Sequence, residues 1–147
     1  MKLTPHFTIE EFEHSSTAIA RGISNRVTDP QARRNLANLC VQVLEPLRQY
    51  ARRPIAISSG FRCTDLNRAV GGAATSNHLT GCAADLVIPD EATGRRWFAW
   101  VMANCPFDEL IWEHSRDGFR PWIHVALRPS GNRHRIVANL VKSTSPP

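Results

Sequence analysis

Residues 76–88 read SNHLTGCAADLVI and bring together the residue types of a metal site. His78 lies in an expected loop, Gly81 allows the chain to turn tightly, and Asp85 follows within an apolar strand. A carboxylate inside such a strand needs a charged partner, hydrogen bonds or a metal, because an unpaired buried charge is costly. The segment therefore indicates either a metal ligand at Asp85 or a buried acid that pairs with Arg62 or with backbone amides.

A second histidine stands on a later strand, in the segment WIHV at residues 122–125. Catalytic zinc typically takes three nitrogen or oxygen ligands from the protein and leaves the fourth position to water. Ligands from a loop and from strands of a rigid sheet would hold such an open geometry. The two segments together predict a zinc site made of His78, Asp85 and His124.

Helix and strand signals are mixed without the regular βαβ order of a parallel sheet. Thr8 and Glu11 form a capping box, and Asp29-Pro30 begins a helix that Pro46 is expected to kink or end. Further helices are expected over residues 64–70 and 91–104, and strands over residues 55–57, 82–88, 108–114 and 122–127. The last two strands would form a hairpin. These elements predict an α+β fold, in which helices flank an antiparallel sheet.

Length and charge indicate one domain with a basic end. The chain has 147 residues, of which 42% are hydrophobic and 21% charged, as in ordinary globular domains. Residues 128–147 hold four cations and no acid, so they carry +4 of the net charge of +5. We expect the domain that holds the zinc site to cover residues 1–127, followed by a basic extension over 128–147 with a flexible end. The extension is either a solvated tail or a segment that binds an anionic polymer.

The sequence also bears on location and redox state. No apolar run approaches the roughly 20 residues that span a bilayer, so no membrane insertion is expected. The N-terminus shows no secretory signal, which predicts synthesis in the cytoplasm and mostly reduced thiols. A bridge between Cys63 and Cys82, which flank the predicted site, stays open.

The pattern Ser76-x-His78-x-x-Gly81-x-Ala83-x-Asp85, followed much later by WIH at residues 122–124, resembles the zinc DD-peptidase family. This family includes D-alanyl-D-alanine carboxypeptidases, dipeptidases and phage endolysins, and it shares its fold with the hedgehog signalling domain. The upstream segment ISSGFR at residues 57–62 and the pair Leu66-Asn67 are also similar to the family. The resemblance extends from about residue 7 to residue 127.

The resemblance implies a role for each matching position. His78, Asp85 and His124 would be the zinc ligands. Arg62 would contact substrate and stabilise developing negative charge, unless it only forms a structural salt bridge. Ser76 would bind substrate, unless it only caps the loop. Trp122 shares its strand face with His124 and is expected to line the cleft.

The sequence offers two candidates for the general base. Many family members carry an acid three residues before the last histidine, where this chain has Pro121. The nearest acids upstream are Asp117, in the expected turn, and Glu113, on the partner strand. A glutamate across the strand from His124 could reach the site, so Glu113 is the predicted base and Asp117 the alternative.

These features predict a zinc-dependent peptidase that cleaves amide bonds of peptidoglycan stem peptides. It would be a D-Ala-D-Ala carboxypeptidase or a cell-wall endopeptidase, related to phage or prophage, and a monomer. Without a signal, it would reach the wall through a separate membrane lesion or on a phage particle. Because Pro121 replaces the expected acid, a zinc-stabilised structural or wall-binding module is the alternative. Nucleic acid is not an expected partner, because the basic end lacks aromatic and groove-reading elements.

Overall fold

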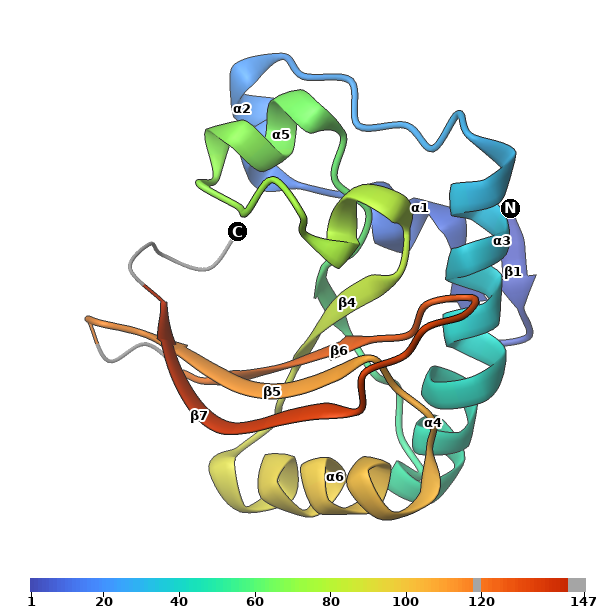
Figure 1. The fold of residues 1–147 in the computed structure, drawn as a ribbon, viewed down its shortest axis with the longest axis vertical. Helices are drawn as coiled ribbons and strands as arrows, with labels where there is room; N and C mark the ends of the chain where they lie inside the picture. The colour runs from blue at the N-terminus through green and yellow to red at the C-terminus, as the bar shows by residue number, and fades with distance from the viewer. Residues whose placement is uncertain (118–119, 143–147) are drawn as a thin grey trace.

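The computed structural model describes residues 1–117 and 120–142 as a five-stranded sheet with helices packed on it (Figure 1). The strands are β1 Lys2–Thr4, β2 Phe7–Thr8, β3 Ile57–Ser59, β4 Ala83–Val87, β5 Glu109–Ser115, β6 Trp122–Ala126 and β7 Arg135–Lys142. The helices are α1 Ile9–Glu13, α2 Ser16–Arg21, α3 Pro30–Leu39, η1 Cys40–Leu44, α4 Glu45–Ala51, α5 Thr64–Ala69, η2 Asn77–Thr80 and α6 Glu91–Asn104. The predicted α+β fold with flanking helices is confirmed.

The main sheet has the strand order β3-β4-β6-β5-β7, while β1 and β2 form a separate pair. Strands β3, β4, β6 and β5 pair antiparallel, and β5 with β6 makes the predicted hairpin. Strand β7 pairs with β5 in the parallel direction, so the sheet is mixed at this edge. Strand β3 begins at Ile57, two residues later than predicted.

Side-chain alternation divides the sheet into an apolar face and a polar face. Leu110 and Trp112 of β5 and Ile123 and Val125 of β6 belong to the hydrophobic core, with residues of α3, η1, α4 and α6. The residues between them face the opposite side, where the segment after α5 lies over the sheet (Figure 1). The polar face is therefore free to hold a site, while the apolar face supplies stability.

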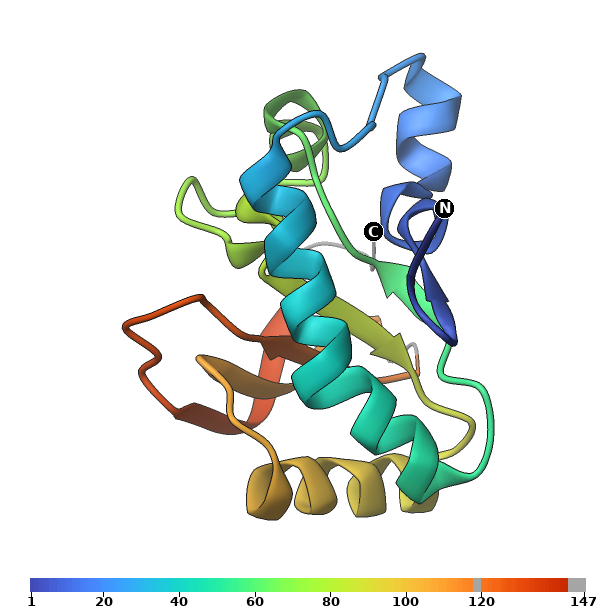
Figure 2. The same ribbon diagram turned by 90° about the vertical axis from the view of Figure 1, so that its right-hand side faces the viewer.

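The long helix continues through Pro46 by changing its hydrogen-bonding pattern. Residues Cys40–Leu44 form a π-helical turn, η1, in which the Glu45 N–H bonds to the Cys40 carbonyl. Pro46 follows directly in α4, and because proline has no N–H to donate, the regular hydrogen-bond ladder is interrupted here without ending the helix. Figure 2 shows α3, η1 and α4 as one continuous bent rod beside the sheet.

Much of the basic C-terminal segment is part of the sheet. Eight of its residues, Arg135–Lys142, form β7, so this part of the chain is not a solvated tail. The domain boundary at residue 127 stays a prediction, and the predicted flexible end, 143–147, lies outside the described residues.

Two further predictions concern thiols and the membrane. All four cysteines are free, so Cys63 and Cys82 form no bridge in the structure. None of the helices over the described ranges combines the length and the apolar character that a bilayer crossing requires.

Gly81 is required by the close approach of two segments and not only by its backbone angle. It has φ of 73°, and a Cβ there would lie 2.5 Å from the Ala32 carbonyl oxygen. Gly131 has a similar φ of 70°, but a Cβ at that position would meet nothing within 4 Å. We expect Gly131→Ala to cost about 1 kcal/mol of unfolding free energy and Gly81→Ala about 3 kcal/mol in urea denaturation. Equal losses would contradict the packing argument.

Candidate metal centre

His78 is held in place by the backbone around it. It lies in η2, where its amide donates to the Ser76 hydroxyl at 3.2 Å. Its ring Nδ1 lies 2.6 Å from the Gly60 carbonyl oxygen, which can only accept, so Nδ1 carries the proton. The second ring nitrogen, Nε2, is thereby left with a free lone pair, and it lies 3.3 Å from Asp85 Oδ1.

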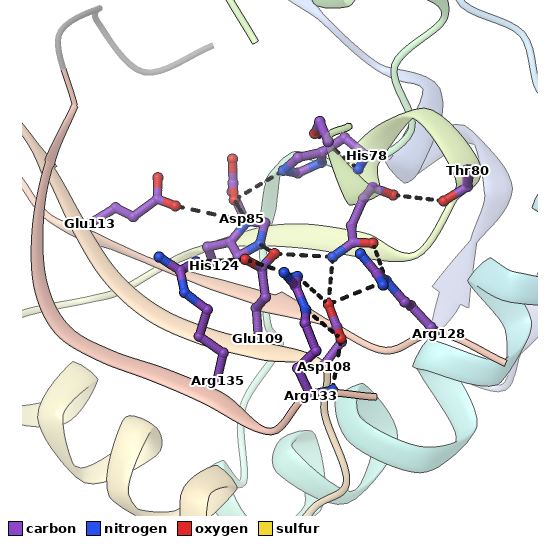
Figure 3. A network of polar contacts seen from close by, with 12 residues as sticks. His78, Thr80, Asp85, Asp108, Glu109, Glu113, His124, Arg128, Arg133 and Arg135 are labelled. Atoms are coloured by element: carbon purple, nitrogen blue, oxygen red, sulfur yellow. Dashed lines mark hydrogen bonds and ion pairs between the residues drawn. The ribbon is translucent and has the colours of Figure 1, made fainter. Parts of the chain in front are cut away.

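Asp85 and His124 are direct partners in the antiparallel pair of β4 and β6. Residues opposite each other in such a pair present their side chains on the same face. His124 Nδ1 lies 3.0 Å from Asp85 Oδ1, so the carboxylate contacts both imidazoles (Figure 3). One donor atom from each of His78, Asp85 and His124 lies within 4.8 Å of the others, and all three residues are buried.

Burial and mutual contact shift the pKa values of this cluster. Burial alone raises the pKa of the Asp85 carboxyl, but the two histidines outweigh it and hold the pKa well below its usual range. Burial lowers the pKa of His78, against the attraction of Asp85. For His124 burial also acts downward, yet hydrogen bonds to Asp85 and Glu109 raise its pKa to about 9. The ionised carboxylate of Asp85 is therefore stabilised between the two imidazole rings.

The donor set fits a zinc ion. Two imidazole nitrogens and one carboxylate oxygen are ligands that zinc accepts in catalytic sites, with one position left open. The three donors open on a pocket of about 530 Å³ on the polar face of the sheet. A carboxylate only 2% exposed, with two histidines turned toward it, is also the environment in which a cation would offset the cost of burial.

The structure places Glu113 in this pocket and Asp117 away from it. The Glu113 Oε1 atom is 3.9 Å from His124 Nδ1, and the residue is 2% exposed. Burial and the charge of Asp85 raise the pKa of Glu113, against the attraction of His124 and Lys142. Asp117 is exposed after β5 and accepts a hydrogen bond from Ser115. Geometry thus favours Glu113 as the acid beside the cluster.

Arg62 forms the structural salt bridge that was one of its two predicted roles, and it also lies at the pocket. Its Nη2 lies 3.7 Å from Asp85 Oδ2, which makes the predicted salt bridge, and its guanidinium also lines the pocket. Nε donates to the Ser59 hydroxyl and Nη1 to the side-chain oxygen Oδ1 of Asn67, both at 3.3 Å. Burial lowers its pKa, against the charges of Asp85 and Glu113. The guanidinium is therefore held rigidly at the edge of the cluster.

Ser76 and Trp122 differ in position. The Ser76 hydroxyl caps η2, as the alternative interpretation expected, and the residue also lines the pocket. Trp122 shares the His124 face but is 5% exposed, and it lies opposite Glu113 in the strand pair. Among the described residues it does not belong to the pocket lining, because strand parity predicts the face and not the depth. This geometry gives no support to its predicted contact with substrate.

Sequence reasoning missed Glu109, which accepts from His124 Nε2 at 3.2 Å. The two-residue period of a strand could have indicated it, because Glu109, Ile111 and Glu113 share one face of β5. Asn77 was also missed. Its Nδ2 donates to Glu109 and to Asp108, and no local pattern distinguishes it from a loop residue.

The cations of the C-terminal segment turn toward acids of the domain. Arg133 makes two side-chain hydrogen bonds to Asp108, at 3.1 and 2.8 Å, and Arg128 Nε lies 3.3 Å from the same carboxylate. Arg135 pairs with Glu109 at 2.8 Å and Lys142 with Glu113 at 3.6 Å. These ion pairs, drawn in part in Figure 3, do not favour the segment as a binding site for an anionic polymer.

An α+β domain in which two histidines and a buried aspartate meet in a pocket, with a glutamate beside them, is an arrangement typical of metal-dependent hydrolases. The chain belongs to the peptidase M15 family, whose sequence profile matches residues 5–126. The resemblance to zinc DD-peptidases is thereby confirmed, and the family assigns a peptidase with a peptide substrate. No curated protein matches the chain significantly.

Asp108 gives a test of the network beneath the site. It is 0% exposed, and although burial opposes this, its hydrogen bonds to Arg133 and Asn77 hold its pKa well below the usual range. A lowered folded-state pKa stabilises the fold above the unfolded value of about 4, and this contribution is lost as the pH falls. We expect Asp108→Asn to lower the unfolding free energy at pH 7 by about 2 kcal/mol, and this difference to shrink by about 1 kcal/mol at pH 3.

The control for this prediction is Asp65→Asn. Asp65 is exposed and lies 3.9 Å from Arg68 in the same helix, so its charge is screened by water. Urea denaturation with a chelator present should show little effect of Asp65→Asn at either pH. A difference for Asp108→Asn that is the same at pH 7 and pH 3 would contradict the proposed role of the ionised carboxylate.

Proposed function

We propose that this chain is a zinc-dependent peptidase that hydrolyses an amide bond of peptidoglycan stem peptides. The observation that carries the proposal is the meeting of the Glu113 carboxylate with the donors of His78, Asp85 and His124 in one pocket. We further propose that it acts as a D-Ala-D-Ala carboxypeptidase or a cell-wall endopeptidase of phage or prophage origin. This finer assignment follows from the sequence resemblance.

His78, Asp85 and His124 would hold the zinc ion. When bound, zinc supplies a Lewis acid that polarises the scissile carbonyl and lowers the pKa of water to about 7. Glu113 takes the proton of the attacking water and returns it to the leaving amine. The raised pKa of Glu113 suits this role, because a carboxylate of higher pKa is a stronger base.

Arg62 would stabilise the negative charge of the transition state. Its guanidinium is buried, charged and fixed by Ser59 and Asn67, so it needs little rearrangement when negative charge develops on the carbonyl oxygen. The pocket is also lined by Arg128, Arg133, Arg135 and Lys142. These cations pair with acids of the domain, but with Arg62 they outnumber the acids of the lining, Asp85, Glu109 and Glu113. The remaining positive charge is compatible with the free carboxylates of stem peptides.

The non-catalytic alternative rested on Pro121, which stands where many relatives carry an acid. Glu113 supplies a buried carboxylate at the cluster from the neighbouring strand. This geometry supports the peptidase over a purely structural zinc module.

The test is Glu113→Gln, which keeps the shape of the side chain and removes its basicity. We expect kcat on purified peptidoglycan, measured as the release of stem-peptide fragments, to fall at least about 100-fold. Zinc content should stay near that of the wild type, because Glu113 is not a proposed ligand. Asp117→Asn is the matched control and should retain activity.

Two outcomes would count against the proposal. If Glu113→Gln kept full activity, another group would have to be the base. If the zinc-loaded wild type released no fragments from peptidoglycan, the assignment of substrate would be wrong.

A further inference from the structure

Glu109 is a largely covered acid of the pocket lining that the proposed reaction does not use. Its side chain is 13% exposed, and its Oε1 lies 3.2 Å from Nε2 of His124. The other ring nitrogen of His124, Nδ1, lies 3.0 Å from Asp85. His124 is thus enclosed between two carboxylates, one on each nitrogen (Figure 3).

A single nitrogen of a neutral imidazole cannot both bind a metal and donate a hydrogen bond. When one nitrogen is a ligand, the other carries the proton, and its acceptor sets the tautomer and the orientation of the ring. In His124 the nitrogen that faces Asp85 is Nδ1. If Nδ1 binds the zinc, Nε2 carries the proton, and Glu109 is the acceptor within reach.

We propose that Glu109 is a positioning residue of the metal centre, whose carboxylate accepts the Nε2–H of His124 and so holds Nδ1 toward Asp85 and the zinc. This inference rests on the proposed zinc-dependent function. His78 has a corresponding arrangement, in which the Gly60 carbonyl oxygen receives Nδ1–H and leaves Nε2 toward Asp85. One histidine is therefore oriented by a neutral backbone group and the other by an anion, which also makes its ring a more basic ligand.

Glu109 is itself held by residues from two other segments. Asn77 Nδ2 donates to Oε1 at 3.0 Å, so this oxygen is shared between the amide and His124. On Oε2, Arg135 Nη1 lies at 2.8 Å and Arg133 Nη2 at 3.4 Å. The carboxylate is thus fixed at both oxygens and cannot rotate freely away from the imidazole.

Arg135 belongs to β7, which follows the residues that match the peptidase M15 profile. The parallel pairing of β7 with β5 places Arg135 directly opposite Glu109 in the register. Strand β7 therefore supports the metal centre through a chain of contacts from Arg135 to Glu109 to His124. This role gives Glu109 and Arg135 a function beyond that of an ordinary ion pair between neighbouring strands.

The competing explanation is that Glu109 only joins β5 to β7 by ion pairs. Both Arg133 and Arg135 are about half exposed, at 48% and 47%, so such pairs alone are screened and contribute little to folding. A purely structural role would change the stability of the fold and leave the zinc affinity of the folded protein unchanged. The zinc affinity of the folded protein therefore distinguishes the positioning role from the purely structural role.

The experiment measures the zinc dissociation constant by competition with a chelator, in wild type, Glu109→Gln and Arg135→Gln. We expect Glu109→Gln to bind zinc about 10- to 100-fold more weakly, because the carboxylate that orients His124 is replaced by a neutral amide. Arg135→Gln should weaken binding in the same direction by a few-fold. Glu91→Gln is the matched control, because Glu91 is 70% exposed and lies in α6, outside the pocket.

A second readout comes from the ring N–H resonance of His124 in the zinc-loaded protein. It should lie far downfield in the wild type and move upfield in Glu109→Gln, which a role in folding alone would not cause. Urea denaturation of the zinc-free proteins identifies any variant that does not fold. If Glu109→Gln does not fold, the zinc affinity of Arg135→Gln, which changes an exposed side chain, tests the inference.

The outcomes separate this inference from the proposed function. If the wild type binds zinc and both variants bind it equally well, the positioning role is overturned. If the wild type binds no zinc, the proposed function itself fails, whatever the variants do. Weaker zinc binding in Glu109→Gln with unchanged binding in Glu91→Gln supports the inference.

Discussion

The contact of one buried carboxylate with two imidazoles is the constraint on which the polar face of the sheet depends. Asp85 sits on a central strand, 2% exposed, and such a group must be paired with charge or hydrogen bonds to be tolerated. His78, His124 and Arg62 meet this need from a loop, a neighbouring strand and a buried segment. Because each partner is in turn held by other residues, the need to compensate the charge of Asp85 fixes the positions of many side chains in the pocket.

The contacts of the C-terminal segment give its positive charge a different role from the one that the sequence suggests. Its four cations suggest an anionic ligand when counted in the sequence, but in the structure they face Asp108, Glu109 and Glu113. These acids lie at the edge or within the pocket, where burial would otherwise raise the cost of ionisation. The segment thus closes the pocket on the β7 side and compensates its negative charge.

Sequence reasoning succeeded where the information is local and failed where partners come from distant segments. The capping signals at Thr8 and Asp29 predicted helix starts, and two neighbouring strand signals predicted the hairpin of β5 and β6. His78, Asp85 and His124 stood in short motifs, so they could be named and the structure brings them together. Strand β7 could not be predicted, because RIVANLVK does not alternate and its strand is largely exposed on both faces. Glu109 was missed because its role depends on Asn77 and on a parallel partner strand far along the chain.

The binding of one zinc ion by His78, Asp85 and His124 underlies every proposed step, and metal content tests it without assuming a substrate. The protein would be saturated with zinc, freed of excess metal, and analysed by mass spectrometry beside His78→Ala, with circular dichroism as a check that the variant folds. We predict about one zinc per chain in the wild type and almost none in the variant. A wild type without zinc, or a folded His78→Ala that keeps the full amount, would contradict the zinc site, and Asp85 would then be a buried structural acid.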